Sequence, residues 1–365
     1  VGENSQNLII HGDNLEALKA LMPYYYGRIK CIYIDPPYNT GNEKWIYNDK
    51  VNSPKIKQWL GKVVGRESED LTRHDKWLCM MYPRLKLLRD LLAEDGAIFV
   101  SIDDNEQSNL RLLMDDIFGE NNFITSIIWQ KKFSPQNDAK YFSDNHDFIL
   151  AFAKDKKNWK RKLLPRSEAM DLRYDNPDND PRGPWASSDL SVKTYSKDYD
   201  YPITTPSGKV INPTKGRCWR TSKTNLEKLI LDNRIWFGKN KDGVPRIKRF
   251  LSEVQEGLVP LTIWLHQDVG HNQQARQDLK TIFPDADFPF ETPKPISLIK
   301  RILQIATDEN SIVLDSFAGS GTTGHAVLDL NKDGGNRKFI MVEIEDEVAK
   351  KITAERVKRA ITKYD

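Results

Sequence analysis

The chain has 365 residues, a formal net charge of +3, 39% hydrophobic residues and 29% charged residues, which describes a globular protein with a sizeable core and a polar surface. No apolar run approaches the roughly 20 residues that span a bilayer, and the first residues carry no signal-peptide pattern, so we expect neither a membrane partner nor export. Three scattered cysteines (Cys31, Cys79 and Cys218) fit a reducing compartment, and the six histidines form no spaced pair with them. We therefore expect a cytoplasmic protein with no metal site.

The N-terminal part, residues 7 to about 153, alternates strand-like and helix-like segments. In chain order we expect a strand at 7–11, a helix at 13–22, a strand at 29–35, a long helix at 75–96 and an apolar strand at 97–103. Asp13 or Asn14 caps the first helix, and the long helix bends at Pro83 and ends at Gly96. This alternation predicts an α/β fold with a parallel sheet.

The stretch "CIYIDPPYNTG" runs an apolar strand into an acid, two prolines and a tyrosine. Each proline removes a backbone donor and fixes φ, so the strand ends there. Asp35 and Tyr38 then stand on a stiff turn at the end of a buried element. Such a turn either does no more than end the strand or forms part of a functional site.

The middle part, residues 154–290, loses the alternation and gains Pro, Asp, Asn and Gly, which predicts an irregular inserted domain. Residues 209–250 hold twelve Lys or Arg against three Asp or Glu, with Trp219 and Trp236 interleaved. A solvated basic face and a nucleic-acid surface are equally consistent with this composition. The candidates for DNA contact are Lys215, Arg217, Arg220, Arg246, Lys248 and Arg249.

From Glu291 the α/β pattern returns, with a helix at 295–306, strands at 311–315 and 338–345, and a helix from about Gly321 between them. The segment "VLDSFAGSGTTGHAVLDL" spells G-x-G-x-x-G across Gly319, Gly321 and Gly324, and Glu343 follows 22 residues after Gly321. This spacing meets the description of a nucleotide-binding turn, although a merely tight strand-to-helix turn has the same pattern. Because the segment after Gly324 is too short for the second half of a dinucleotide fold, we expect the N-terminal part to complete the sheet.

These features together resemble the β class of DNA amino-methyltransferases that use S-adenosylmethionine. The segments "HGDNLEAL", "DPPYNTG", "DGAIFVSIDDNE", "ETPKPISLIKRIL" and "VLDSFAGSGTT" are similar to motifs of this family, above all to modification subunits of type III restriction systems and their stand-alone relatives. The resemblance implies a Rossmann-like methyltransferase sheet, mostly parallel, with helices on both faces and a permuted motif order. It divides the chain into a methyltransferase part at 1–153, an irregular α+β target-recognition insert at 154–290 and a second methyltransferase part at 291–365.

The resemblance also implies roles for single residues. The Asp35 carboxylate and the Pro36 carbonyl accept the N–H groups of a target amino group, Pro37 stiffens the turn, and Tyr38 offers an aromatic face to a base turned out of the duplex. Asp13 is equally well explained as an ordinary N-cap. Trp129 and Phe133 are candidates for the base pocket, with aromatic core as the alternative. The implied cofactor-binding residues are Asp13, Asn14, Thr292, Lys294, Pro295, Asp315, Phe317, Ala318, Gly319, Gly321 and Glu343.

The expected function is site-specific transfer of a methyl group from S-adenosylmethionine to N6 of adenine in double-stranded DNA, within a restriction–modification system. A carboxylate at Asp35 favours adenine, because cytosine-N4 relatives usually have serine there and a carboxylate accepts the stronger hydrogen bond. Three alternatives stay open: a cytosine-N4 methyltransferase, an RNA methyltransferase and a nicotinamide-dependent dehydrogenase. The expected partners are DNA, a second copy of the chain and a restriction subunit.

Overall fold

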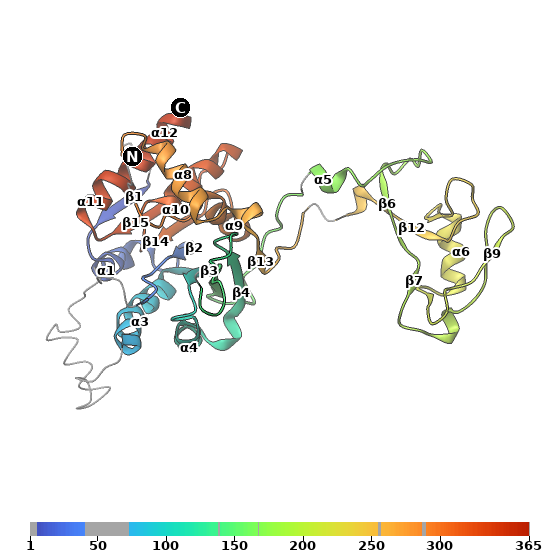
Figure 1. Cartoon of the computed structure of the whole chain (residues 1–365), viewed down its shortest axis with the longest axis horizontal. Helices are drawn as coiled ribbons and strands as arrows, with labels where there is room; N and C mark the ends of the chain where they lie inside the picture. The colour runs from blue at the N-terminus through green and yellow to red at the C-terminus, as the bar shows by residue number, and fades with distance from the viewer. Residues whose placement is uncertain are drawn as a thin grey trace. The chain divides into compact units, whose positions relative to one another are not determined.

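The computed structural model describes residues 6–40, 73–137, 139–166, 168–254, 257–286 and 290–364. The chain forms two compact units (Figure 1). Unit 1 consists of residues 1–164 together with 259–365, and unit 2 consists of residues 165–258. Unit 2 lies inside the range 154–290 that the sequence predicts for the insert. No helix in the described part of the chain combines the length and the apolar character needed to cross a membrane.

Unit 1 is built on one sheet of eight strands in the order β1-β15-β14-β2-β3-β5-β4-β13. The strands from β1 to β3 in this order pair in parallel, β5 pairs antiparallel to both β3 and β4, and β13 pairs in parallel with β4. The bounds are β1 Leu8–His11, β2 Ile29–Ile34, β3 Leu92–Ile102, β4 Phe123–Gln130, β5 His146–Ala153, β13 Ile263–Trp264, β14 Ile312–Asp315 and β15 Lys338–Glu343.

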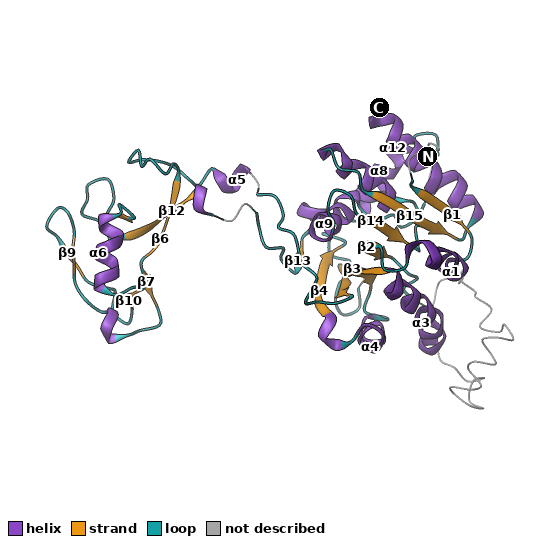
Figure 2. Cartoon of the chain, turned by 180° about the vertical axis from the view of Figure 1, so that it is seen from behind, coloured by secondary structure: helices purple, strands orange, loops and turns teal. Residues whose placement is uncertain are grey.

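Helices cover both faces of this sheet (Figure 2). On one face, buried residues of α1, α3 and α4, such as Leu18, Trp77 and Leu110, pack against the strands. On the other face, α9, α10 and α12 contribute residues such as Ile302 and Val327. The helices of unit 1 are α1 Asn14–Tyr25, α3 Arg73–Leu91, α4 Gln107–Phe118, α7 His266–Val269, α8 Asn272–Ile282, α9 Ile296–Ala306, α10 Thr322–Leu330, α11 Asp346–Val348 and α12 Glu355–Tyr364. The predicted α/β class, with a mostly parallel sheet covered on both faces, is confirmed.

The long helix α3 ends earlier than the sequence predicts. It stops at Leu91, and β3 begins at Leu92 rather than at residue 97. Gly96 is therefore not a helix stop, because it lies within β3. An added Cβ there would stand 2.8 Å from the Ile29 carbonyl oxygen, so the close approach of the neighbouring strand requires this glycine.

The strand order of the sheet brings the acidic proline turn and the glycine turn together, although they lie far apart in the sequence. β2 precedes the acidic proline turn and β14 precedes the glycine turn, and these strands are neighbours, with Val313 paired to Cys31 and Leu314 paired to Ile32. Parallel strands point their carboxyl ends to one edge, where open α/β sheets bind ligands. Both turns therefore leave the sheet side by side at that edge.

Unit 2 has short strands around a small core of its own. The core contains Leu190, Trp219, Leu226 and Phe237, and helix α6 packs on it through Leu226. Its elements are α5 Glu168–Asp171, β6 Trp185–Asp189, β7 Ser191–Val192, β8 Ile203–Thr204, β9 Val210–Ile211, β10 Cys218–Trp219, α6 Lys223–Leu231, β11 Ile235–Trp236 and β12 Arg246–Phe250. The strands form the sheets β11-β12-β6, β10-β7 and β8-β9.

Candidate active site

The turn after β2 is clamped from two sides. The Trp77 indole N–H on α3 donates to the Pro37 carbonyl oxygen at 2.7 Å. Asn39, whose φ of 60° lies in the left-handed region, donates from its side-chain amide to the Arg73 carbonyl oxygen at 3.3 Å and to the buried Glu106 carboxylate. These contacts fix the turn from outside the strand, so the side chain of Asp35 has a defined position.

The two carboxylate oxygens of Asp35 have different surroundings. Oδ2 lies 2.5 Å from the Lys294 ammonium, which comes from the residue just before the N-cap of α9. Oδ1 is buried and accepts no hydrogen bond from any residue that the structure describes. A buried carboxylate oxygen without a donor is unfavourable, so Oδ1 is suited to a donor supplied by a ligand.

Tyr38 and Asp147 extend the site toward β4 and β5. The Tyr38 hydroxyl donates to Asp147 Oδ2 at 3.4 Å, and Lys131 donates to Asp147 Oδ1 at 2.7 Å. Burial raises the pKa of Asp147, while Lys294 and Lys131 oppose that rise. The Lys294 ammonium also stands 5.1 Å from the centre of the Tyr38 ring.

Asp147 is a site residue that the sequence analysis missed. It is the second residue of the apolar segment "HDFILAFA", which forms β5, and β5 runs antiparallel to β3, with Phe148 paired to Ile102. The first residues of β5 therefore lie at the carboxyl ends of the parallel strands. An acid at the start of an otherwise apolar strand was the available signal, and only the direction of the strand shows that this acid reaches the site.

The glycine turn between β14 and α10 depends on residues without side chains. Gly319 and Gly321 have φ of 49° and 75°, and a Cβ on Gly319 would stand 3.1 Å from the Phe290 ring. A Cβ on Gly324 would stand 2.6 Å from the Met341 methyl carbon, so α10 packs closely on β15. The three glycines thus provide the sharp turn, the close approach and the helix–strand packing that their spacing predicts.

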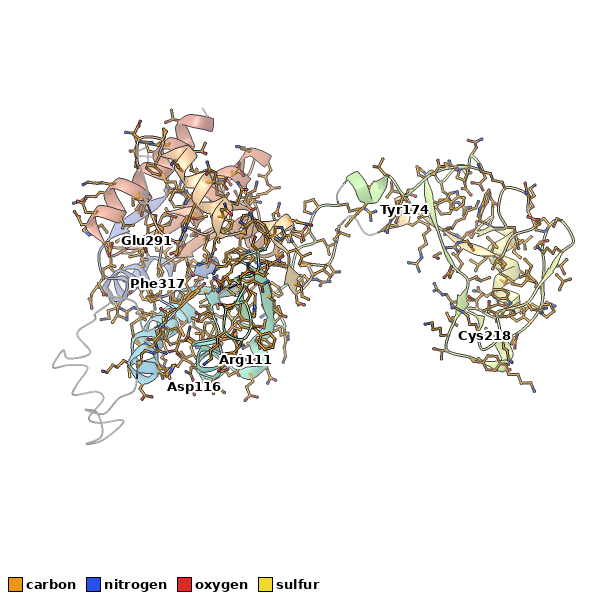
Figure 3. All side chains as sticks on the ribbon, in the orientation of Figure 1. Arg111, Asp116, Tyr174, Cys218, Glu291 and Phe317 are labelled. Atoms are coloured by element: carbon orange, nitrogen blue, oxygen red, sulfur yellow. The ribbon has the colours of Figure 1, made fainter. Side chains whose placement is uncertain are left out.

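Two acids hold this turn from the ends of β14 and β15. Glu343 accepts hydrogen bonds from the Gly319 and Glu345 backbone N–H groups, at 2.8 and 3.0 Å, and burial raises its pKa. Asp315 accepts from the Phe317 N–H at 3.0 Å and from the Thr323 hydroxyl at 2.5 Å. Burial raises the pKa of Asp315 to about 7. Figure 3 labels Phe317 on this turn.

One cavity of about 620 Å³ joins the two turns. Its wall also includes Lys131 and Asp147 on the side of β4 and β5, and Phe290 and Thr322 on the side of α10. Of the residues that the sequence predicts for the site, the cavity is lined by Asp35, Pro36, Pro37, Tyr38, Thr292, Lys294, Asp315, Phe317, Ala318, Gly319 and Glu343.

The other predicted cofactor residues have structural contacts and are not among the described residues that line the cavity. Asp13 is the N-cap of α1 and accepts from the Leu15 and Glu16 N–H groups. Asn14 is buried and donates to the Ser316 carbonyl oxygen at 2.8 Å, so it ties α1 to the glycine turn. Pro295 is the N-cap of α9, and Gly321 is the N-cap of α10.

The two aromatic candidates for the base pocket have different environments. Trp129 is fully buried and donates from its indole N–H to the Gly270 carbonyl oxygen at 3.0 Å, so it belongs to the core. Phe133 is half exposed and stacks on His266, with 5.3 Å between the ring centres.

The basic residues predicted to contact DNA lie in unit 2 in three environments. Lys215, Arg220 and Arg249 are exposed. Arg217 donates to the Ser191 carbonyl oxygen, and Arg246 pairs with Asp189 at 2.9 Å.

Lys248 is the exception among the predicted DNA contacts. Its side chain is buried and forms ion pairs with Asp178 and with Asp180, the latter at 3.2 Å. The prediction that Lys248 contacts phosphate was wrong, because strand alternation places this residue on the inner face of β12.

The sheet, the glycine turn and the acidic proline turn define an α/β protein with a ligand cavity at the carboxyl edge of its parallel strands. Residues 29–355 match the family model described as DNA methylase, and the chain belongs to this family.

Curated relatives cover nearly the whole chain. The StyLTI Mod subunit of a type III restriction-modification enzyme from Salmonella typhimurium is 37% identical over 97% of this chain and 55% of its own length. The EcoP15I Mod subunit from Escherichia coli is 31% identical over 94% of this chain and 59% of its own length. The type II methyltransferase M.KpnI from Klebsiella pneumoniae is 30% identical over 95% of this chain and 83% of its own length. The chain thus spans little more than half the length of the Mod subunits that it matches.

Solved structures give weaker likenesses. The PvuII DNA methyltransferase (cytosine-N4-specific) has a TM-score of 0.49 at 14% identity, covering 99% of this chain and 92% of that one. The complex of M1.HpyAVI with SAM has a TM-score of 0.43 at 17% identity, covering 96% and 98%.

Proposed function

We propose that this chain is an S-adenosylmethionine-dependent methyltransferase that acts on N6 of adenine in double-stranded DNA. The observation that carries the proposal is the Asp35 carboxylate, whose buried Oδ1 lacks a donor among the described residues. Asp35 lines the same cavity as the glycine turn and Glu343. One cavity thus contains both a hydrogen-bond acceptor suited to an amino group, on Asp35, and the glycine turn suited to a nucleotide.

The residues around the glycine turn fit S-adenosylmethionine. The cavity of about 620 Å³ is within the usual range for a ligand of this size. Glu343 accepts the Gly319 and Glu345 backbone N–H groups, and because a carboxylate has about four lone-pair sites it can also accept a ribose hydroxyl. Phe317 and Ala318 give apolar surface beside it. The cofactor, when bound, supplies an activated methyl group on sulfur.

Asp35 and Pro36 would orient the accepting nitrogen. Asp35 Oδ1 and the Pro36 carbonyl oxygen each accept one N–H of the amino group, which directs the lone pair of the nitrogen toward the methyl group. Positive charge develops on the nitrogen during transfer, and the carboxylate stabilises it. Because Trp77 and Glu106 already hold the turn, little reorganisation accompanies the reaction.

Lys294 would hold the Asp35 carboxylate in place. Its ammonium lies on Oδ2 and leaves Oδ1 for the amino group. A charge-assisted hydrogen bond to one oxygen fixes the orientation of the carboxylate, so the other oxygen keeps its position in the cavity. Lys294 therefore belongs to the catalytic half of the cavity, in addition to the cofactor contact that the motif implies.

Tyr38 would stack on the target base, because an amino group inside a duplex is out of reach until its base leaves the stack.

Adenine is favoured over cytosine as the target base, since Asp35 supplies a full carboxylate where cytosine-N4 relatives usually carry serine. Membership of the DNA methylase family supports DNA as the substrate, and the choice of adenine rests on Asp35.

The proposed setting is a cytoplasmic restriction–modification system. Relatives that are named as Mod subunits of type III enzymes support a restriction subunit as the partner. Self-association into a homodimer rests on the family resemblance alone. Sedimentation of the protein, alone and with a restriction subunit, tests both partners.

Incubating the protein with DNA and methyl-labelled cofactor, followed by digestion to nucleosides, tests the activity. We expect the label to run with N6-methyladenine. Label in N4-methylcytosine would overturn the choice of base, and absence of label from every nucleoside would overturn the methyltransferase function. Mapping the methylated bases in a plasmid grown with the gene then identifies the recognition sequence.

A further inference from the structure

The connection between β4 and β5 presents two consecutive aromatic side chains to solvent. Tyr141 is 82% exposed and Phe142 is 93% exposed, the highest values among aromatic residues in the described part of the chain. Single exposed apolar residues are common, but two adjacent rings exposed to this degree are not. The Lys140 ammonium stands 5.2 Å from the centre of the Tyr141 ring, so positive charge accompanies the pair.

The ends of this connection belong to the wall of the cavity. Lys131, Lys132 and Asp144 line the cavity, and Lys131 joins the two ends by bonding to Asp144 at 3.1 Å and to Asp147 at 2.7 Å. The Lys132 N–H donates to the Asn145 carbonyl oxygen at 3.2 Å.

A further hydrogen bond joins the two sides of the connection beyond these contacts. The Gln136 N–H donates to the Ser143 hydroxyl at 2.8 Å, one residue beyond Phe142. The aromatic pair is therefore tethered, through a few hydrogen bonds, to the rim of the cavity that holds Asp35 and Tyr38.

A base that leaves the duplex leaves a gap in the stack, and proteins that distort DNA often insert apolar side chains between base steps. Aromatic rings are suited to this task because every base offers a face on which they stack. A neighbouring lysine adds attraction to the phosphates on either side.

We propose that Tyr141 and Phe142 form a wedge that enters the DNA stack and fills the space vacated by the target base. This inference rests on the proposed DNA methyltransferase function. It assigns to unit 1 a contact with the duplex itself, whereas the basic residues expected to contact DNA all lie in the insert. The wedge acts on the flipping step and touches neither the cofactor nor the accepting nitrogen.

The test compares the full-length wild-type protein with the double variant Tyr141→Ala/Phe142→Ala. The substrates are two duplexes that carry the site methylated in the plasmid: one fully paired, the other with an abasic site opposite the target adenine, which lowers the cost of flipping. In single-turnover methylation we expect the double variant to lose about 10- to 100-fold on the paired duplex. On the duplex with the abasic site, most of that loss should disappear.

Three controls accompany the test. Tyr24→Ala removes a 70% exposed tyrosine on α1 that does not line the cavity, and should leave both rates unchanged. The exchange Tyr141→Phe/Phe142→Tyr keeps two rings and should retain the wild-type rate on paired DNA. Calorimetry should give the same cofactor affinity for the double variant as for the wild type.

Other outcomes would overturn the wedge. Equal losses on both duplexes would mean that the rings serve chemistry or folding, and an unchanged rate on the paired duplex would mean that they do not enter the stack. A double variant that sediments in a lower oligomeric state than the wild type would assign the rings to an interface between copies of the chain. If the wild type binds cofactor but methylates neither duplex, the proposed function fails instead.

Discussion

At the level of single residues, Asp35 combines one oxygen held by Lys294 with one that has no donor among the described residues. Replacing it with alanine removes the proposed acceptor for the amino group and leaves the proposed cofactor contacts on β14 and β15 in place. We expect Asp35→Ala to lose at least about 100-fold in the rate of methyl transfer, because a preorganised polar contact in an active site contributes on this scale.

Measuring cofactor affinity distinguishes a role of Asp35 in methyl transfer from a role in cofactor binding. Calorimetry should show the Asp35→Ala variant binding S-adenosylmethionine within a few-fold of the wild type. Asp95→Ala, at an exposed acid that pairs with Lys30, is the matched control and should change neither quantity. A collapse of cofactor affinity together with activity would assign Asp35 to cofactor binding.

Asp315 gives a pH-dependent prediction at the same scale. Burial raises its pKa from 3.8 to about 7 in the folded protein. Between these pH values the folded state holds a proton that the unfolded state has lost, so the contribution of Asp315 to stability falls as pH rises from about 4 to about 7 and is constant above that. Asp315→Asn removes this titration.

The measurement is the free energy of unfolding of both proteins, without cofactor, across this pH range. We expect the Asn variant to gain on the wild type as pH rises, by at most about 4 kcal/mol, with no further change above about pH 7. A difference between the two proteins that does not depend on pH would contradict the raised pKa. Glu343 also has a raised pKa, and its charge helps to raise that of Asp315, so the difference between the two proteins includes the coupling of this pair.

At the level of elements, the turn from β14 into α10 depends on backbone geometry that side chains disturb. Gly321 has a φ of 75°, and an added Cβ would stand 3.1 Å from the Thr353 carbonyl oxygen. Gly334, before β15, has a φ of 92° but nothing within 4 Å of an added Cβ. The two positions share the left-handed conformation and differ in the close approach.

Substituting each glycine by alanine separates the cost of a side chain in the left-handed conformation from the cost of the close approach. We expect Gly334→Ala to lower the free energy of unfolding by about 1 kcal/mol, which is the cost of placing a Cβ at positive φ. Gly321→Ala should cost about 1–3 kcal/mol more, because π-helical residues around Thr353 must move away. Chemical denaturation measures both, and equal costs would show that the turn tolerates a side chain.

At the level of the whole molecule, the chain combines a cavity in unit 1 with basic residues in unit 2, and the charges of unit 2 have two different environments. Lys248 is enclosed with Asp178 and Asp180, and Asp180 also binds Arg182 at 2.8 Å. Arg249, on the same strand, is exposed. Charge alone therefore does not identify a DNA contact.

Two variants distinguish these roles. Lys248→Met leaves two acids without their buried cation and should destabilise unit 2 by about 3–5 kcal/mol, measured by hydrogen exchange over residues 165–258. The triple variant Lys215→Gln/Arg220→Gln/Arg249→Gln should keep its stability, weaken DNA binding and reduce the slope of log affinity against log salt by about 3. An unchanged salt slope would mean that these exposed residues contact no phosphate.

Both turns of the cavity were predictable from the sequence, because each consists of residues whose own covalent structure sets the local backbone. Pro36 and Pro37 end β2 because proline interrupts a strand in any context. Gly319 and Gly321 permit the left-handed turn that precedes α10. The alternation of apolar segments likewise predicted a parallel sheet, since strands buried on both faces are apolar throughout.

What only the tertiary structure decided are the contacts between segments far apart in the chain. Lys294 lies on Asp35, and Asp147 reaches Tyr38, because β14 pairs with β2 and β5 runs antiparallel to β3. Lys248 is buried among acids whereas Arg249 is exposed, because side chains alternate between the faces of β12. Strand order, strand direction and burial depend on the packing of the entire chain, and no local pattern of residues contains them.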